Sequence, residues 1–458
     1  MNKVTPQIWQ FHVACFLTHD DLRNMMEVSQ QSRKYCLLAF VTRSSWPQSK
    51  CDTLSFPIFK VHEVFDPMIL SNDIQQIQFC MTFNEPFTLP QTLISLQFGR
   101  HFNQPLPILP QTLQILKLGF GFNQPLPDLP QRLAILDFAH CFNQALPELP
   151  QTLVILHFGS TFNQPLPDLP PTLTSLHFGT NFDQPLPKLP PTLRILEFGF
   201  WFNHPLPDLP QTLTTLHLGN QFNIALPNLP PCLTTLHFGF RFNQPLPDLP
   251  QTLTILEFGD EFNQPLPNLP RTITILKFGD NFNQPLPDLP PTLSKLYFEN
   301  NFNQPLPELP QTLTILYFGH DFNQPLPDLP PTLIILELGF WFNHPLPELP
   351  PTITSLIFGS IFDQPLPNLP PSLTMLEFGS WFNQPLPDLP QTLVILHLGN
   401  SFNQVLPDLP RAVKHLRLGT QFNHVLPFYL KSIVQNPNQF RYSKKPKKTR
   451  RKKNFFIG

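Results

Sequence analysis

The chain has 458 residues, of which 61 are proline and 46 phenylalanine, and only 13% are charged. Proline at this frequency without a Gly-X-Y period is typical of disordered chains. However, a chain that is 41% hydrophobic has enough apolar surface to offset the entropy of folding. Nine basic residues lie between Arg441 and Lys453, which leaves 20 basic against 31 acidic residues elsewhere. The excess of acidic residues outside this segment argues against general nucleic-acid binding by the rest of the chain.

The spacing of the cysteines and the lack of long apolar segments indicate in which cellular compartment the protein resides. The six cysteines show neither CxxC spacing nor clustering, so we expect reduced thiols in an intracellular protein. No window approaches 18 apolar residues, and the N-terminus lacks a basic-then-apolar signal pattern. We therefore expect a soluble protein of the cytoplasm, the nucleus or both.

Residues 1–40 carry a helical period. Ile8, Phe11 and Cys15 follow the spacing of an amphipathic helix, and Leu22 and Met25 belong to a second predicted helix. Two short helices bury too little apolar surface to fold alone. We expect this module to pack against the rest of the chain or a partner.

The same segment resembles the F-box, although Thr5, Gln7 and Gln31 depart from that pattern. The resemblance implies docking on the Skp-type adaptor of a cullin–RING ubiquitin ligase. A plain helical cap is the alternative. The residues expected to bind the adaptor are Pro6, Ile8, Trp9, Val13, Phe16, Leu17, Leu22 and Val28.

Residues 41–82 are interpreted as a connector and N-terminal cap. The segment Ile74–Phe79 (IQQIQF) mimics the strand of the repeats that follow, and we expect it to start their sheet.

Residues 83–433 are built from internal repeats. A phenylalanine recurs every 20 residues from Phe102 to Phe422, which gives 16 complete repeats between two atypical ends. Atypical ends are expected in repeat proteins because the terminal repeats must close the core against water.

One repeat predicts one circuit of a solenoid. Residues 252–259 (TLTILEFG) indicate a strand with Leu256 and Phe258 inward, and Phe262 is expected in the core. The following PLPNLP segment cannot form a helix or a central strand, because proline lacks an N–H and fixes φ. We expect an extended, polyproline-like return with Leu266 and Leu269 turned inward.

These features predict a mainly β fold: a right-handed, leucine-rich-repeat-like solenoid with a parallel sheet, a small N-terminal helical module and a disordered basic tail. The phrase FNQPLP with LPxLPxTLxxLxFG resembles the FNIP repeat, a relative of leucine-rich repeats abundant in slime-mould amoebae and in giant viruses of amoebae. The resemblance implies a protein-binding function. If the chain is viral, it would use the ligase of its host.

Sequence variation is concentrated at the positions equivalent to Asp260 and Glu261 and on the outward side of the strand. Drift at solvated positions explains such variation without a ligand. Matched aromatic residues favour contact with a target protein, because exposed tryptophans are enriched at interface hot spots. The candidate target-binding residues are Phe200, Trp201, Phe240, Phe340, Trp341 and Trp381.

Other patterns carry less information. Histidines recur at the position of Glu257, but we expect no metal site because no carboxylate or thiol completes a tetrahedral set there. The position of Asn268 is acidic in 11 of the 16 complete repeats, which indicates a solvated face. No catalytic motif is present, so we expect no enzyme activity and no cofactor.

Residues 434–458 are interpreted as a disordered basic tail. A nuclear-import signal, a weak tether to nucleic acid or an anionic surface, and a solubilising tail are the three interpretations. The candidate import residues are Lys444, Lys445, Lys447, Lys448, Arg450, Arg451, Lys452 and Lys453.

Overall fold

The computed structural model describes residues 59–61, 74–79, 81–435 and 439. The predicted F-box-like module, most of the connector and the basic segment lie outside the described residues. By its contacts the chain divides into two compact units, Met1–Phe242 and Asn243–Gly458.

Each unit is a stack of short strands. The first unit contains β1 (Phe59–Val61), β2 (Gln76–Phe79), β3 (Ser95–Gln97), β4 (Ile115–Lys117), β5 (Ile135–Asp137), β6 (Ile155–His157), β7 (Ser175–His177), β8 (Ile195–Glu197), β9 (Thr215–His217) and β10 (Thr235–His237). The second unit contains β11 (Ile255–Glu257), β12 (Ile275–Lys277), β13 (Lys295–Tyr297), β14 (Ile315–Tyr317), β15 (Ile335–Glu337), β16 (Ser355–Ile357), β17 (Met375–Glu377), β18 (Ile395–His397), β19 (His415–Arg417) and the 3-10 helix η2 (Phe428–Ser432).

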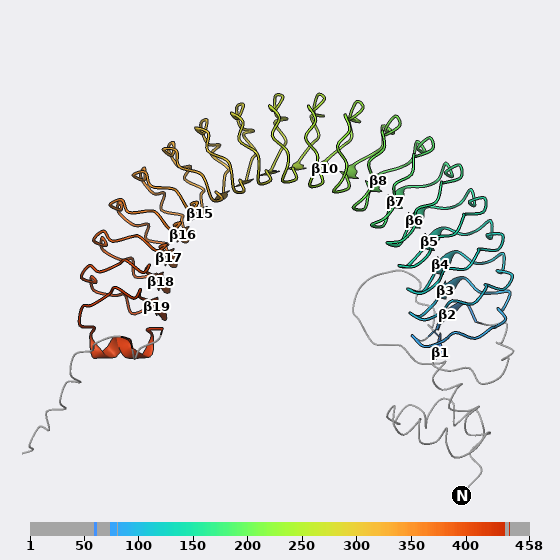
Figure 1. Ribbon diagram of the computed structural model, residues 1–458, viewed down its shortest axis with the longest axis horizontal. Helices are drawn as coiled ribbons and strands as arrows, with labels where there is room; N and C mark the ends of the chain where they lie inside the picture. Colours follow the sequence, from blue (N-terminus) through green and yellow to red (C-terminus); the bar gives the residue numbers. More distant parts are fainter. Residues whose placement is uncertain (1–58, 62–73, 80, 436–438, 440–458) are drawn as a thin grey trace, which may run out of the picture. The chain divides into compact units, whose positions relative to one another are not determined.

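Within each unit, successive strands pair in parallel and in register, so that Leu256 lies opposite Leu276. The strands line the concave side of each stack, and the proline-rich returns line the opposite side (Figure 1). The predicted parallel solenoid of 20-residue repeats is confirmed. Almost no helix accompanies it in the described part of the chain.

The strand of each repeat is shorter than predicted. Residues 252–259 were expected to be extended, but β11 covers only Ile255–Glu257. The preceding residues form a turn, because the N–H of Leu253 bonds to the carbonyl of Pro250 at 3.1 Å. The threonine at the start of the repeat belongs to this turn, where its hydroxyl group bonds to the previous repeat. Thr272 Oγ1, for example, donates to the carbonyls of Gln251 and Leu253.

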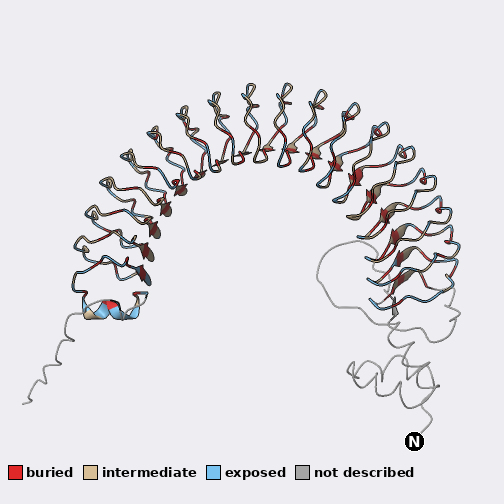
Figure 2. Cartoon of the chain, viewed as in Figure 1, coloured by how far each residue is buried: buried red, intermediate tan, exposed pale blue. Residues whose placement is uncertain are grey.

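The core consists of ladders of identical side chains. Leu256 and Phe262 are fully buried and Phe258 nearly so, as predicted, and Leu253 is fully buried as well. Buried positions follow the strands through both units (Figure 2). Phenylalanine rings of successive repeats stack nearly parallel, which gives each repeat a large apolar contact with its neighbours.

The return that contains Leu266 is less buried than predicted, although the equivalent of Leu269 is buried in half of the complete repeats, as at Leu249 and Leu309. Leu266 and Leu269 are only partly buried, whereas Pro270 is buried. The spacing between repeats supplies the reason. Equivalent rings lie 5.4 Å apart at Phe258–Phe278 but 6.0 Å apart at Phe262–Phe282, further from the sheet. The stack therefore opens towards the returns, and adjacent leucines there cover one another less completely.

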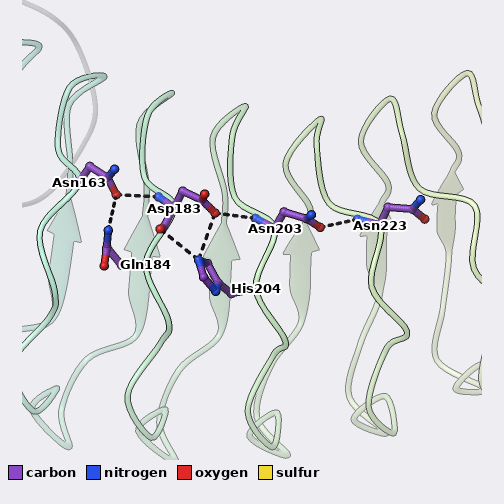
Figure 3. A network of polar contacts seen from close by, with 6 residues as sticks. All are labelled: Asn163, Asp183, Gln184, Asn203, His204 and Asn223. Carbon is purple, nitrogen blue, oxygen red and sulfur yellow. Dashed lines mark hydrogen bonds and ion pairs between the residues drawn. The ribbon is translucent and has the colours of Figure 1, made fainter.

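An asparagine ladder holds the repeats together where the return begins (Figure 3). The side-chain oxygen of Asn163 accepts hydrogen bonds from the backbone N–H of Asp183 (3.0 Å) and from Nε2 of Gln184 (3.1 Å). The same pattern recurs from repeat to repeat. It satisfies backbone donors in a segment whose prolines cannot form a ladder of their own.

Both ends of the array depart from the repeat pattern. We predicted that β2 would be the first strand of the sheet. This prediction is wrong, because β1 precedes β2 and pairs with it in parallel. At the other end, η2 buries Leu430, and Val434 forms a parallel bridge with Leu416 of β19. This bridge covers the last strand edge, which would otherwise expose unpaired backbone groups.

Candidate functional site

The rim is the two-residue turn after each strand, at the positions of Asp260 and Glu261. Its backbone is fixed by hydrogen bonds between successive repeats, such as Trp341 N–H to His320 O (3.0 Å) and Trp381 N–H to Ser360 O (2.9 Å). These backbone hydrogen bonds therefore fix the positions from which the rim side chains project, whatever residue type is present. A variable surface is thus carried on an invariant backbone.

The six predicted target-binding residues are all exposed on the rim. Their exposed fractions run from 36% for Phe340 to 62% for Trp381. Large aromatic side chains with this exposure in a well-packed protein are typical of contact surfaces.

The structure brings some of these residues together. Phe200 and Trp201 make an edge-on contact with ring centroids 4.9 Å apart, and Phe340 and Trp341 do the same at 5.2 Å. His320 stacks on Phe340 at 4.6 Å. The two pairs belong to different units. Each pair presents one compact aromatic surface, because the rings support one another.

Sequence reasoning missed Phe120, which occupies the same rim position as Phe200 and is 41% exposed. Its ring stacks on His140 at 4.5 Å, and Cζ of Arg100 lies 4.8 Å from the ring centroid. The signal was present in the sequence, since the 20-residue period places Phe120 in register with the other rim aromatics.

The strand face is the surface formed by the outward residues of the strands, at the positions of Ile255 and Glu257. In the first unit it carries a row of polar contacts. Nδ1 of His177 lies 2.7 Å from Glu197 Oε2, and Nδ1 of His217 lies 3.3 Å from Glu197 Oε1. Glu197 therefore lies between two of these histidines, a contact that the sequence analysis did not identify. Even so, no group of three or more His, Cys, Asp or Glu side chains in the described residues is placed to hold a metal ion.

Ser175 extends this row, since its Oγ lies 2.6 Å from Nε2 of His177. The order serine, histidine, carboxylate is that of a nucleophile, its base and the group that orients the base. However, Ser175 is only 8% exposed, and its own N–H donates to the carbonyl of Val154 at 3.2 Å. That N–H is not available to stabilise an oxyanion, so the contact is interpreted as a structural one.

Burial, followed by the neighbouring His177, lowers the pKa of His157 from its usual value. The two rings are 4.2 Å apart. A second histidine so close disfavours the charged form of His157. His157 is therefore uncharged at neutral pH, and it gains a positive charge only on acidification.

In the second unit, strands β13 to β17 present Tyr297, Tyr317, Glu337, Ile357 and Glu377 in succession on the strand face. Tyr297 and Tyr317 lie 6.3 Å apart, and Glu337 follows on the next strand. Burial, followed by Glu377, raises the pKa of Glu337, and burial also raises that of Tyr317. Lys277 Nζ lies 3.4 Å from Glu299 Oε1 nearby.

The acidic column at the position of Asn268 lies on the return side, and its members are exposed. The predicted adaptor-binding residues from Pro6 to Val28 and the import residues from Lys444 to Lys453 lie outside the described residues. Across the part of the chain that the structure describes, no helix combines the length and apolar character that a membrane crossing needs.

Comparisons with known proteins agree with this architecture. The family model described as FNIP Repeat matches several stretches along the chain, at residues 67–121, 162–200, 202–241, 242–281, 262–301, 282–320, 302–340 and 342–381. None of the curated proteins gives a significant match.

Two of the similar solved structures bear on the fold. CroV588, described as a novel circular LRR protein structure, is 41% identical with a TM-score of 0.68; the match covers 77% of this chain and 57% of CroV588. The chain thus spans little more than half the length of that protein. YopM from Yersinia enterocolitica WA-314 is 29% identical with a TM-score of 0.58, over 79% of this chain and 90% of YopM. With family matches over more than half of its residues, this chain belongs to the FNIP repeat family.

Proposed function

We propose that this protein is a substrate receptor of a cullin–RING ubiquitin ligase. In this proposal the solenoid binds a target protein through the aromatic rim, and the N-terminal segment docks on the Skp-type adaptor. The similarity to leucine-rich-repeat proteins supports the first half, since stacked repeats provide extended binding surfaces. The F-box resemblance of residues 1–40 supports the second half.

The observation that carries the target-binding half is the exposure of the rim aromatics. Several repeats have small polar or acidic residues instead of an aromatic residue at the same rim positions, for example Ser160, Asp260 and Asn300. The fold therefore does not require a ring there. Exposed rings cost solubility, and burial in a partner interface offsets that cost.

Co-purification of the full chain with a Skp-type adaptor tests the ligase half. We expect the adaptor to be captured by the native chain and lost from an Ile8→Ser, Leu22→Ser variant. The matched control is Trp341→Ser, which should retain the adaptor. If the native chain captures no adaptor while its repeats remain folded, the alternative stands: a scaffold or decoy solenoid whose N-terminal helices are only a cap.

The basic segment is proposed as a nuclear-import signal, which supports a function in the nucleus as well as the cytoplasm. Residues 441–458 fused to an inert cytoplasmic reporter should move it into nuclei. A reporter that stays in the cytoplasm would favour a tether or a solubilising tail instead.

A further inference from the structure

Four adjacent strands of the second unit, β14 to β17, carry Tyr317, Glu337, Ile357 and Glu377 at one matched position. We call these four residues the acidic strip. Paired parallel strands are about 4.8 Å apart, so the two carboxylates flank Ile357 at roughly 10 Å from one another. The strip combines negative charge with aromatic and apolar surface.

Glu337 has no ion-pair partner on the strip. Its carboxylate makes no hydrogen bond or ion pair with any side chain that the structure describes, although the residue is half-buried. Glu377 is only weakly engaged. Its Oε2 lies 3.3 Å from Nδ1 of His397, yet that nitrogen forms no hydrogen bond. Partly desolvated carboxylates without partners attract a cation more strongly than fully solvated ones do.

The surroundings of the strip suit a lysine or arginine side chain. Ile315 and Ile335 lie beside it on the same strands, and Tyr317 is the strand partner of Glu337. The alkyl stem of a basic residue packs on aliphatic surface while its head pairs with a carboxylate or lies over a ring. The strand face therefore offers apolar surface for the stem of a basic side chain and a carboxylate for its charged head.

The chain itself contains a segment of matching charge. Residues 243–435 include 16 acidic and seven basic residues, a net charge of −9. Residues 436–458 include nine basic residues and no acidic residue, a net charge of +9. The two net charges are therefore equal and opposite.

The basic segment starts within reach of the strip. Gln435 is bonded to Leu416 on β19, four strands away from Glu337 on β15. Four strand spacings amount to about 19 Å. The nine residues from Gln435 to Lys444 include Gln439 in a 3-10 turn. With one such turn and the remaining residues extended, they still span about 26 Å. The connection is long enough without any change in the repeats.

We propose that residues 441–453 of this chain lie across the acidic strip, with basic side chains paired to Glu337 and Glu377. The strip is preferred over the acidic column on the return side for a physical reason. The carboxylates of that column are exposed, and exposed ion pairs are weak because water and salt screen them. On the strip, the same charges are partly shielded from water.

Zero-length cross-linking of the full chain, which joins a lysine amine directly to a carboxylate, tests this proposal. We expect peptides that link Lys444, Lys445, Lys447 or Lys448 to Glu337 or Glu377. These cross-links should be lost in a Glu337→Gln, Glu377→Gln variant. They should persist in the matched control Glu348→Gln, Asp388→Asn, which changes two carboxylates of the acidic column.

A mixture of isotopically labelled and unlabelled chains separates the possible occupants. Cross-links confined to a single isotopic form support the proposal. Cross-links between the two forms would show that the strip takes the segment of a second copy, which overturns it. Cross-links only to the acidic column, or none at all at low salt, would also overturn it and leave the strip to a basic segment of another protein.

Discussion

The side-chain Oδ1 of Asp183 accepts a hydrogen bond from the backbone N–H of Asn203 at 3.1 Å. In the next repeat, Oδ1 of Asn203 accepts in the same way from the N–H of Asn223 at 3.0 Å. The ladder therefore needs only an acceptor oxygen at this distance from Cα, which asparagine and aspartate both supply. This explains why Asp183 and Asp363 replace asparagine without interrupting the array.

We predict that Asn263→Ala is destabilising and that Asn263→Asp is nearly neutral. Oδ1 of Asn263 accepts from the N–H of Asn283 (2.9 Å) and from Nε2 of Gln284 (3.1 Å). Alanine leaves both donors without this acceptor, which should cost about 1–3 kcal/mol. Chemical denaturation with hydrogen exchange at Asn283 measures the effect. Equal losses for both variants would contradict the acceptor role.

Core and rim substitutions should separate stability from binding. Leu256→Ala opens a cavity at a fully buried site and should cost about 2–5 kcal/mol of unfolding free energy. Trp381→Ser, at an exposed site, should change it by less than about 0.5 kcal/mol. If the ring is a hot spot, the serine variant should instead weaken target binding by about 2 kcal/mol, roughly thirtyfold. Early melting of Trp381→Ser would show that the ring supports the fold.

Ala412→Thr should stabilise the C-terminal end of the array by about 1 kcal/mol. Threonine at this position of other repeats bonds to two carbonyls of the previous repeat, as Thr392 does to Pro371 and Leu373. Ala412 lacks that hydroxyl group. The matched control Ala412→Val adds similar volume without the donor and should give no gain. The midpoint of thermal unfolding distinguishes the two variants.

Acidification should destabilise the first unit through His157. Its pKa in the folded chain lies below the usual 6.5, because burial and the neighbouring His177 disfavour the charged form. The folded state therefore binds a proton less readily than the unfolded state. Its stability contribution is present above pH 6.5 and is lost as the pH falls through the folded-state pKa.

The test compares the native chain with His157→Gln between about pH 7.5 and pH 5, a range that brackets the usual histidine pKa. Over this range, the melting temperature of the native chain should fall further than that of the variant. Asp137, Glu197 and Lys117 also act on His157 electrostatically and remain in both proteins. An equal loss would show that His157 does not carry the effect. Proton NMR of the imidazole reports the pKa directly.

The sequence by itself determined the repeat and its core. Because the period is constant, Leu256, Phe258 and Phe262 could be assigned to the interior from one repeat and extended to all. The same period is enough to assign Trp201, Trp341 and Trp381 to one shared rim position. The orientation of each residue within a repeat was therefore predictable, because the local period determines which side chains face the core.

Only the tertiary structure decided what depends on contact between repeats. The Glu197 bridge between His177 and His217 joins residues that are 20 positions apart, and its geometry follows from the pairing of three strands. The partial burial of Leu266 follows from the way the stack opens towards the returns. The bridge of Val434 to β19 arises because the last strand needs a cover and no further repeat supplies one. A sequence pattern specifies each repeat, but the spacing and the ends of the stack emerge only when the repeats pack together.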